Sequence, residues 1–343
     1  MKIAFTICSN NYLAQAKTLG DSIRKTNSEY EFFIGLTDVF SSEIDYQNEI
    51  GYTIVPVDEI GIPEFDYLWK NYSIIEFNTN VKPFYFHYFI QHFSDLEFLY
   101  YLDPDTFVYN EFTIIEQEFG KNGTALLTPH ILGPIKLDNE VPGESLFLNH
   151  GIFNLGFFGM KNPQPDNEII NWWKERTYHL GYNQPSKGLF VDQLWHNFTP
   201  IFFENVIVSH HPGLNIGPWN LHERKLSEIN YVYLVNNNFP LAFYHFSNYD
   251  YKKSNAISRY YTRYNFDTNS DLKKIYFDYN ELLIKNGIEK LERIKNHFME
   301  MRENYLRIEN LKIISSSPKE LIKYYLKKVL PNKIIHIISI IKN

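Results

Sequence analysis

The chain has 343 residues, of which 44% are apolar and 17% aromatic, and a formal net charge of −7 at pH 7. This length and apolar content suffice for a large folded domain and argue against a disordered chain. The negative charge argues against nucleic acid as a partner, and the single cysteine, Cys8, excludes an intrachain disulfide and a CxxC zinc site.

The N-terminal third alternates short apolar strands with helical patterns. "KIAFTIC" (2–8) predicts a strand rather than a signal peptide, and "YEFFIGLTD" (30–38), "GYTIVPVD" (51–58) and "LEFLYYLD" (96–103) predict three more. Helical patterns lie between them, including the aromatic "VKPFYFHYFIQHF". This alternation predicts parallel βαβ units, whose ligands bind beyond the carboxyl ends of the strands.

The middle of the chain predicts a mixed sheet. "TALLTPHI", "GIFNLGFFGMK" and "LAFYHFSNY" are typical of short strands, and helices are predicted at 167–181 and from 191. From about residue 266 the chain becomes helical and rich in charge. We therefore expect an α/β domain over 1–265, with halves at about 1–110 and 111–265, followed by a helical region over 266–343.

No stretch of about 18 apolar residues indicates a membrane span, so we expect a cytoplasmic protein. The last segment, 318–343, has Lys319, Lys323 and Lys327 on one helical face beside an apolar stripe. Two alternatives follow from this pattern. The segment is a C-terminal helix packed on the core, or it is an interfacial anchor for an anionic membrane surface.

The triplet Asp-Pro-Asp ends the strand predicted at 96–103. In an extended segment Asp103 and Asp105 point the same way, so both carboxylates can reach one cation. Mn²⁺ and Mg²⁺ take such oxygen ligands and bridge to phosphates. A solvated turn is the alternative. Because this Asp-x-Asp follows the strongest strand signal, we predict a metal site.

Four further residues have both a structural and a functional interpretation. His245 ends an apolar strand and is either a core histidine or a third metal ligand. Asp192 and Gln193 begin a helical pattern, where Asp is a common N-cap; a carboxylate and an amide facing a reacting centre are the alternative. Lys82 precedes a proline at a helix start and is either a surface lysine or a ligand for a diphosphate.

The ordered set of Asp-x-Asp, "FNLGFFGMKN", "FVDQ", "GLNIGPWNL" and "HFSNYD" resembles bacterial glycosyltransferases of the GT-A fold. It is similar to the family 8 galactosyl- and glucosyltransferases and to related capsular and lipopolysaccharide enzymes, over about residues 1–265. Asn248 stands where that family has glycine, and no Pro-Trp follows Lys253.

The resemblance implies a role for each candidate. It implies a Mn²⁺ or Mg²⁺ site at Asp103, Asp105 and His245, catalytic roles for Asp192 and Gln193, and donor-binding roles for Thr6, Cys8, Asn10, Asp38, Lys82, Asn154 and Gly156.

The implied activity is metal-dependent transfer of a sugar from a UDP-sugar to a glycan or lipid-linked acceptor in cell-surface polysaccharide synthesis. A phosphatase of the haloacid dehalogenase type is an alternative, although its pattern requires Thr or Val where Phe107 stands. A nucleotidyltransferase requires a glycine-rich loop where "CSNNYLA" follows the first strand. A non-catalytic sugar- or nucleotide-binding module is the third alternative.

Overall fold

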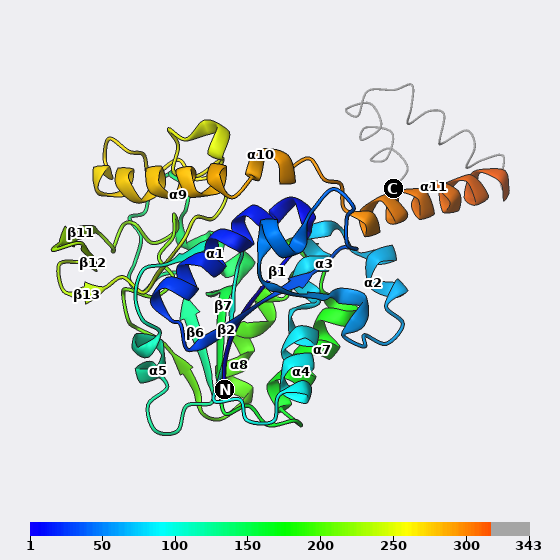
Figure 1. The fold of residues 1–343 in the computed structure, drawn as a ribbon, viewed down its shortest axis with the longest axis horizontal. Coiled ribbons are helices and arrows are strands. Elements are labelled where there is room, and N and C mark those ends of the chain that lie inside the picture. Colours follow the sequence, from blue (N-terminus) through cyan, green and yellow to red (C-terminus); the bar gives the residue numbers. More distant parts are fainter. Residues whose placement is uncertain (317–343) are drawn as a thin grey trace.

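The computed structural model describes residues 1–316, and seven of its strands form one mixed sheet (Figure 1). The strand order is β10-β6-β7-β4-β1-β2-β3. The four strands from β4 to β3 are parallel, and β7 runs antiparallel between β4 and β6. The predicted combination of a parallel α/β half with a mixed second half is therefore confirmed.

The strands have the following bounds: β1 Lys2–Cys8, β2 Tyr30–Leu36, β3 Thr53–Pro56, β4 Phe98–Leu102, β5 Thr106–Val108, β6 Ala125–Pro129, β7 Phe153–Lys161, β8 Asn183–Gln184, β9 Leu189–Phe190, β10 Val206–Val208, β11 Leu226–Ile229, β12 Val232–Val235, β13 Phe239–Pro240 and β14 Phe243–His245. Outside the main sheet, β14 pairs with β5, β8 pairs with β9, and β11, β12 and β13 form a small sheet.

The α-helices have the following bounds: α1 Leu13–Thr26, α2 Asp66–Asn71, α3 Ile74–Asn80, α4 Lys82–His92, α5 Thr113–Glu118, α6 Glu144–His150, α7 Glu168–Leu180, α8 Thr199–Phe202, α9 Lys273–Lys285, α10 Ile288–Leu291 and α11 His297–Ser316. Two 3₁₀ turns matter for the site: η1 (Asn10–Tyr12) and η5 (Gln193–Phe198). The helix predicted from residue 191 is thus a 3₁₀ turn followed by the short α8.

Helices cover both faces of the sheet, which is why β1 is buried from Ile3 to Cys8 and mostly apolar. On one face α1, α5, α9 and α10 share a core with Ala4. On the other face α2, α3, α4 and α7 share a core with Phe5. The aromatic pattern of α4 belongs to this second core, where Phe86 and Phe89 each place their rings 4.9 Å from that of Phe5.

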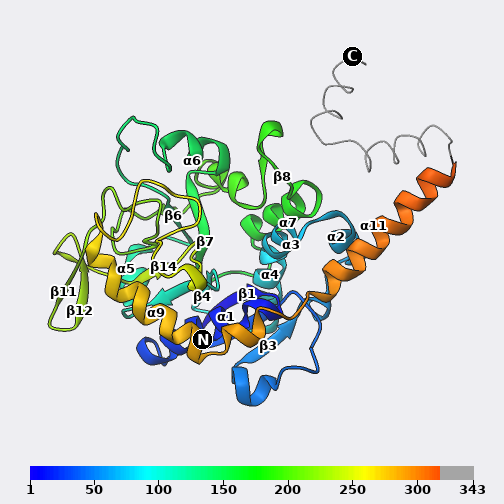
Figure 2. The same cartoon turned by 90° about the horizontal axis from the view of Figure 1, so that it is seen from above.

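Up to residue 316, the predicted C-terminal helical region contains the three α-helices α9, α10 and α11. Gly287, with φ of +82°, takes the left-handed conformation that glycine adopts at helix ends, and it separates α9 from α10. Both helices lie against α1, whereas α11 passes α2 and projects from the body (Figures 1 and 2). The predicted tail, 318–343, lies outside the described residues.

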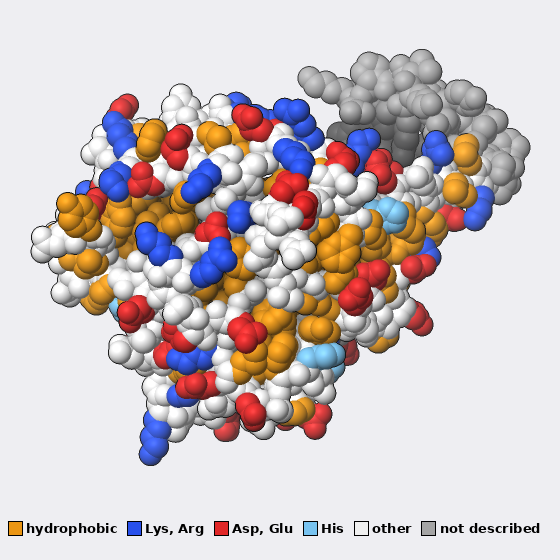
Figure 3. Space-filling view, in the orientation of Figure 1, with side chains coloured by type: hydrophobic (Ala, Val, Ile, Leu, Met, Phe, Trp, Pro, Cys, Tyr) orange, Lys and Arg blue, Asp and Glu red, His pale blue; other side chains and the backbone are white. Residues whose placement is uncertain are grey.

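Two surface properties bear on partners. Over residues 1–316 none of the helices has the length and hydropathy that crossing a bilayer requires. On the face drawn in Figure 3, acidic side chains are interspersed with the basic ones.

Candidate active site

The two aspartates lie in the tight connection between β4 and β5, held from both sides by backbone hydrogen bonds. The N–H of Asp103 donates to the carbonyl of Gly156 on β7 over 2.8 Å, and the carbonyl of Asp105 accepts from the N–H of Phe246 over 2.8 Å. The side chains are 27% and 25% exposed, so they are half-buried and still reachable by a ligand.

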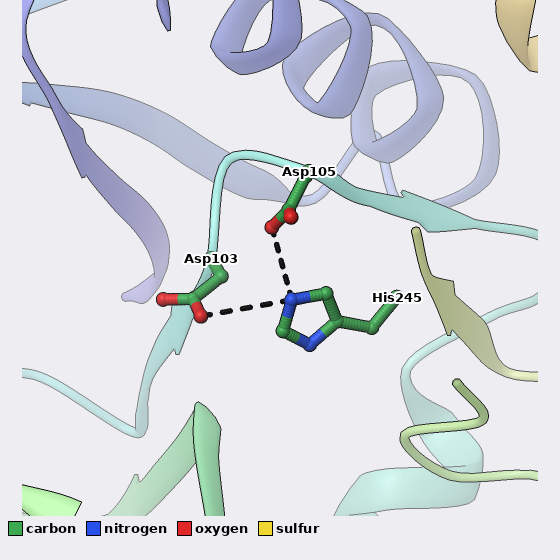
Figure 4. Close-up of side chains that lie close together, drawn as sticks. All are labelled: Asp103, Asp105 and His245. Atoms are coloured by element: carbon green, nitrogen blue, oxygen red, sulfur yellow. Dashed lines mark ion pairs between the residues drawn. The ribbon is translucent and has the colours of Figure 1, made fainter. Parts of the chain in front are cut away.

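Strand pairing brings the histidine to the same place. β14 pairs antiparallel with β5, with His245 opposite Thr106. The imidazole Nε2 lies 2.9 Å from Asp105 Oδ1 and 3.7 Å from Asp103 Oδ2 (Figure 4). One ligand atom from each of the three side chains lies within 4.8 Å of the other two. The structure therefore brings together the three predicted metal ligands.

The donor set fits a hard divalent cation. Burial lowers the pKa of His245, but the neighbouring Asp105 and Asp103 carboxylates outweigh it and raise the pKa overall. Conversely, burial raises the pKa of Asp105 while His245 holds it below its usual range. Two carboxylates thus compete for one imidazole proton, and a cation that replaced this proton would meet two oxygen ligands and one nitrogen ligand, a set that suits Mn²⁺.

Lys82 is a buried cation between two carboxylates and not a surface residue. Its side chain is 4% exposed, and Nζ lies 3.2 Å from Asp192 Oδ2 and 3.7 Å from Asp103 Oδ1. The ammonium group also donates to the carbonyl of Leu155 over 3.0 Å. Burial lowers the pKa of Lys82, but Asp192 and Asp103 more than compensate and raise it. Lys82 therefore links Asp103, one of the predicted metal ligands, to Asp192.

Asp192 does not act as a helix cap. It precedes η5, yet its side chain accepts no capping hydrogen bond from that turn. It is 1% exposed, and burial raises its pKa to about 6 although Lys82 counteracts this shift. A buried carboxylate that lines a cavity beside a cation is a common arrangement at reacting centres. The interpretation as an N-cap, which the residues alone favoured, is therefore wrong.

Gln193 and Asn154 are held by hydrogen bonds at the base of the site. The Gln193 amide accepts from the N–H of Leu155 over 3.1 Å and donates to the carbonyl of His150 over 2.8 Å, so both its ends have protein partners. Asn154 Oδ1 accepts from the N–H of Gly156 over 2.9 Å. These contacts hold the Gln193 amide against the start of β7, and the catalytic role of Gln193 stays a prediction.

A cavity of about 690 Å³ contains the site. Of the predicted site residues, it is lined by Lys82, Asp103, Asp105, Asn154, Gly156, Asp192, Gln193 and His245. Its other walls come from η1, α6, the β8–β9 hairpin, the segment after β14, and α9 with α10.

Four predicted donor-binding residues lie outside this lining. Thr6, Cys8, Asn10 and Asp38 are buried behind the ends of β1 and β2. The Asp38 carboxylate accepts a hydrogen bond over 2.8 Å from the N–H of His297, which is the first residue of α11. The strand ends are thus covered by the chain itself, and η1 presents the next residues to the cavity instead.

The cavity also has polar residues that the sequence did not single out. Tyr12 lies two residues after Asn10, and Gln15 is about one helical turn further along. Tyr279 lies on α9, beyond the region with the family resemblance, and no sequence signal marked it. Tyr101 does not line the cavity, but its hydroxyl donates a hydrogen bond to Asp103 and fixes that carboxylate.

Comparisons with known proteins give the following matches. No protein-family model matches the chain. The uncharacterized protein YfnF of Bacillus subtilis (strain 168) is 26% identical over 279 residues, which cover 81% of this chain and 90% of YfnF.

Two similar solved structures are glycosyltransferases. The galactosyltransferase LgtC, solved with donor and acceptor sugar analogues, is 15% identical with a TM-score of 0.45, over 83% of this chain and 96% of LgtC. The apo-form glycosyltransferase GlyE of Streptococcus pneumoniae TIGR4 is 14% identical with a TM-score of 0.43, over 86% of this chain and 65% of GlyE.

Proposed function

We propose that the protein is a metal-dependent glycosyltransferase. It moves a sugar from a nucleotide-diphosphate donor, which we propose to be a UDP-sugar, to a glycan or lipid-linked acceptor. One observation carries this proposal: Asp103, Asp105 and His245 converge in a large cavity at the carboxyl end of β4, next to the buried Lys82–Asp192 pair. Such a cavity is where an open α/β sheet binds its ligand.

The chain's residues divide the work as follows. Asp103, Asp105 and His245 would hold Mn²⁺ or Mg²⁺, which when bound supplies Lewis-acid stabilisation of a diphosphate leaving group. Asn154 and Gly156 line the part of the cavity next to these three residues. The donor sugar would lie beside them. Asp192 supplies a carboxylate whose charge stabilises the positive character that a sugar carbon gains as its bond to phosphate breaks. Lys82 keeps that carboxylate in place.

The C-terminal tail, 318–343, extends the proposal to where the protein acts in the cell. We place the protein at the cytoplasmic face of a membrane, with the lysines of 318–343 meeting anionic headgroups and a lipid-linked acceptor within reach. This segment lies outside the described residues, so the placement is based on its sequence pattern.

The proposal is tested by measuring the thermal stability of the full chain with a panel of nucleotide sugars, each with Mn²⁺, with Mg²⁺ and with EDTA. We expect at least one nucleotide sugar to raise the melting temperature only when a metal is present, because the diphosphate is held through the metal. The same donor should release its nucleoside diphosphate when acceptor glycans are added. Release of inorganic phosphate from simple phosphate esters would instead identify a phosphohydrolase, and stabilisation without turnover would identify a binding module.

A further inference from the structure

Val191, the residue before Asp192, has a backbone conformation that valine rarely adopts. Its φ of +42° lies in the left-handed region, where the Cβ of a branched side chain crowds the backbone. This conformation costs about 1–3 kcal/mol at residues other than glycine, and strain of this kind is concentrated at functional sites. Glycine would take the same conformation without strain. The chain therefore has a branched side chain at position 191 in spite of a strain that glycine would avoid.

The segment around Val191 is fixed at several points. The β8–β9 hairpin lies beside α6 (Figure 2), and the ring of Phe190 meets that of His150 edge to face, with centroids 4.4 Å apart. The Val191 N–H donates to the carbonyl of Tyr182 over 3.1 Å. Two residues further on, the Gln193 amide is held at both of its ends. Because the chain must turn from β9 into η5 between these contacts, they impose the left-handed conformation on Val191.

The side chain of Val191 is buried at the cavity and not in a core. It is 4% exposed and lines the cavity, yet it belongs to none of the hydrophobic clusters formed by the described residues. Asp192 lines the same cavity although it is almost completely buried. Phe190 and Leu155 add two further apolar side chains to the lining. The carboxylate that we place beside the reacting carbon therefore follows a buried apolar residue and has little contact with water.

The turn at Val191 also explains why Asp192 is not a helix cap. A residue that caps a helix is normally extended, whereas Asp192 is already helical, with φ of −80° and ψ of −31°. Its carboxylate accepts no bond from η5, and Oδ2 lies 3.2 Å from Lys82 Nζ. The backbone of Val191 thus delivers the carboxylate to the cavity, and its side chain adds an apolar group at the same place.

We propose that Val191 keeps water away from the reacting carbon, so that an acceptor hydroxyl and not water takes the sugar. This inference rests on the proposed function, because it concerns the nucleophile that completes that reaction. In hydrolysis, a water oxygen bonds to the anomeric carbon while the bond from that carbon to the diphosphate oxygen breaks. UDP leaves with the electron pair, and the water proton passes to the medium. Excluding water from a reacting centre prevents this side reaction.

The test measures UDP release by the full chain in Mn²⁺ without an acceptor, from UDP-glucose, UDP-galactose and UDP-N-acetylglucosamine. Val191→Ala removes two methyl groups and keeps Cβ, and Val191→Gly removes the whole side chain. We expect both variants to release UDP from at least one of these donors about tenfold faster than the wild type does, since one or two carbons in an apolar wall change discrimination by about that factor. UDP itself should bind both variants as it binds the wild type in calorimetry.

Melting temperatures separate the side chain from the backbone. The melting temperature should rise from Val191→Ala to Val191→Gly, because glycine relieves the left-handed strain, whereas the same step in ordinary backbone lowers stability. Val235→Ala is the control for the loss of a buried valine, because Val235 is fully buried in a core and does not line the cavity. This control should be less stable without releasing UDP faster.

The outcomes separate this inference from the proposed function. Wild-type rates of UDP release in both variants, with UDP still bound, overturn the inference and leave the proposed function intact. Slower release overturns it too, because Val191 would then only support Asp192. Faster release that Val235→Ala shares would come from a general loosening of the fold and also overturns it. A wild-type protein that neither binds UDP in Mn²⁺ nor releases it from any of the three donors overturns the proposed function, and this inference with it.

Discussion

Gly156 lies directly against the imidazole of His245. A β-carbon added at Gly156 would be 2.4 Å from His245 Cε1 and 2.6 Å from Nδ1, closer than atoms can approach. The same residue accepts the backbone hydrogen bond of Asp103. One residue without a side chain on β7 therefore sets the position of one proposed metal ligand on β14 and of another after β4.

We expect Gly156→Ala to fold but to bind Mn²⁺ about 10- to 100-fold more weakly, the range found when the support of a ligand is altered. The methyl group must push the imidazole away from the carboxylates. Calorimetric Mn²⁺ titration measures this effect. Gly143→Ala is the control, because a β-carbon there would have its nearest contact at 3.9 Å. Equal metal affinity in the two variants would show that His245 is not a ligand.

Asp103→Asn and Asp105→Asn each remove a charged ligand without changing the volume of the side chain. We expect turnover to fall about 100-fold or more, since the loss of several kcal/mol of charge stabilisation is worth at least that much. Steady-state kinetics with Mn²⁺ checks the expectation. The exposed Asp166 provides the control variant, Asp166→Asn. If either ligand variant turns over at the wild-type rate, the metal site is misplaced.

The parts of the site that could be predicted from the sequence are those fixed by local pattern. The apolar run of β4 and the two aspartates after it lie within a few residues of each other, so strand periodicity alone placed them at a sheet edge. Pairing of β14 with β5 is a tertiary event. The residues alone left His245 as either a core histidine or a third ligand, and the family resemblance favoured the ligand. Asp38 shows that a place at a strand end does not always put a side chain in the site. Its carboxylate instead accepts a hydrogen bond from the first residue of α11.

Lowering the pH should destabilise the fold, because the buried imidazole of His196 binds a proton less readily than it does in the unfolded chain. Burial lowers the pKa of His196 to about 3, against an ordinary value near 6.5, because its ring is enclosed by Trp173 and Phe158. The unfolded chain binds the proton first, so stability is complete above pH 6.5 and falls as the pH decreases toward 3. Between pH 6.5 and 5 the loss should reach about 2 kcal/mol, at about 1.4 kcal/mol per pH unit.

The variant His196→Asn tests this expectation by chemical denaturation at several pH values. Asn keeps a polar group near Thr199 but cannot titrate, so the variant should be less stable at pH 7 and lose less stability on acidification. His210→Asn, at an exposed position, should leave the pH dependence unchanged. A His196→Asn variant whose stability falls as steeply as that of the wild type would assign the acid sensitivity to other groups.

The tail should bring the protein to anionic lipid. Each lysine near a charged surface contributes about 1 kcal/mol, so the lysines of 318–343 suffice for reversible binding. We expect the full chain to co-sediment with vesicles that contain phosphatidylserine and to be released by salt. A chain ending at residue 317 should remain in the supernatant and keep its activity on a soluble acceptor. Equal sedimentation of the two chains would favour a tail that packs on the protein.

Asp192→Asn should reduce turnover much more than donor affinity. A carboxylate beside the reacting carbon acts mainly in the transition state, so its loss lowers kcat and changes KM little. The variant should also be less stable, since Lys82 then keeps only Asp103 and the carbonyl of Leu155 as partners. Kinetics with a fixed acceptor, together with a melting curve, separate the two effects.

Asp38→Asn is the matched control for this last comparison. Asp38 and Asp192 are each 1% exposed, and each comes shortly after the end of a strand, β2 and β9 respectively. Only Asp192 lines the cavity. Removing the charge of Asp38 weakens its bond to the start of α11, so we expect a lower melting temperature with normal kcat. If both variants lose turnover in proportion to their loss of stability, Asp192 is a structural carboxylate like Asp38. A large fall in kcat for Asp192→Asn alone, at matched stability, makes it a group that acts on the reacting sugar.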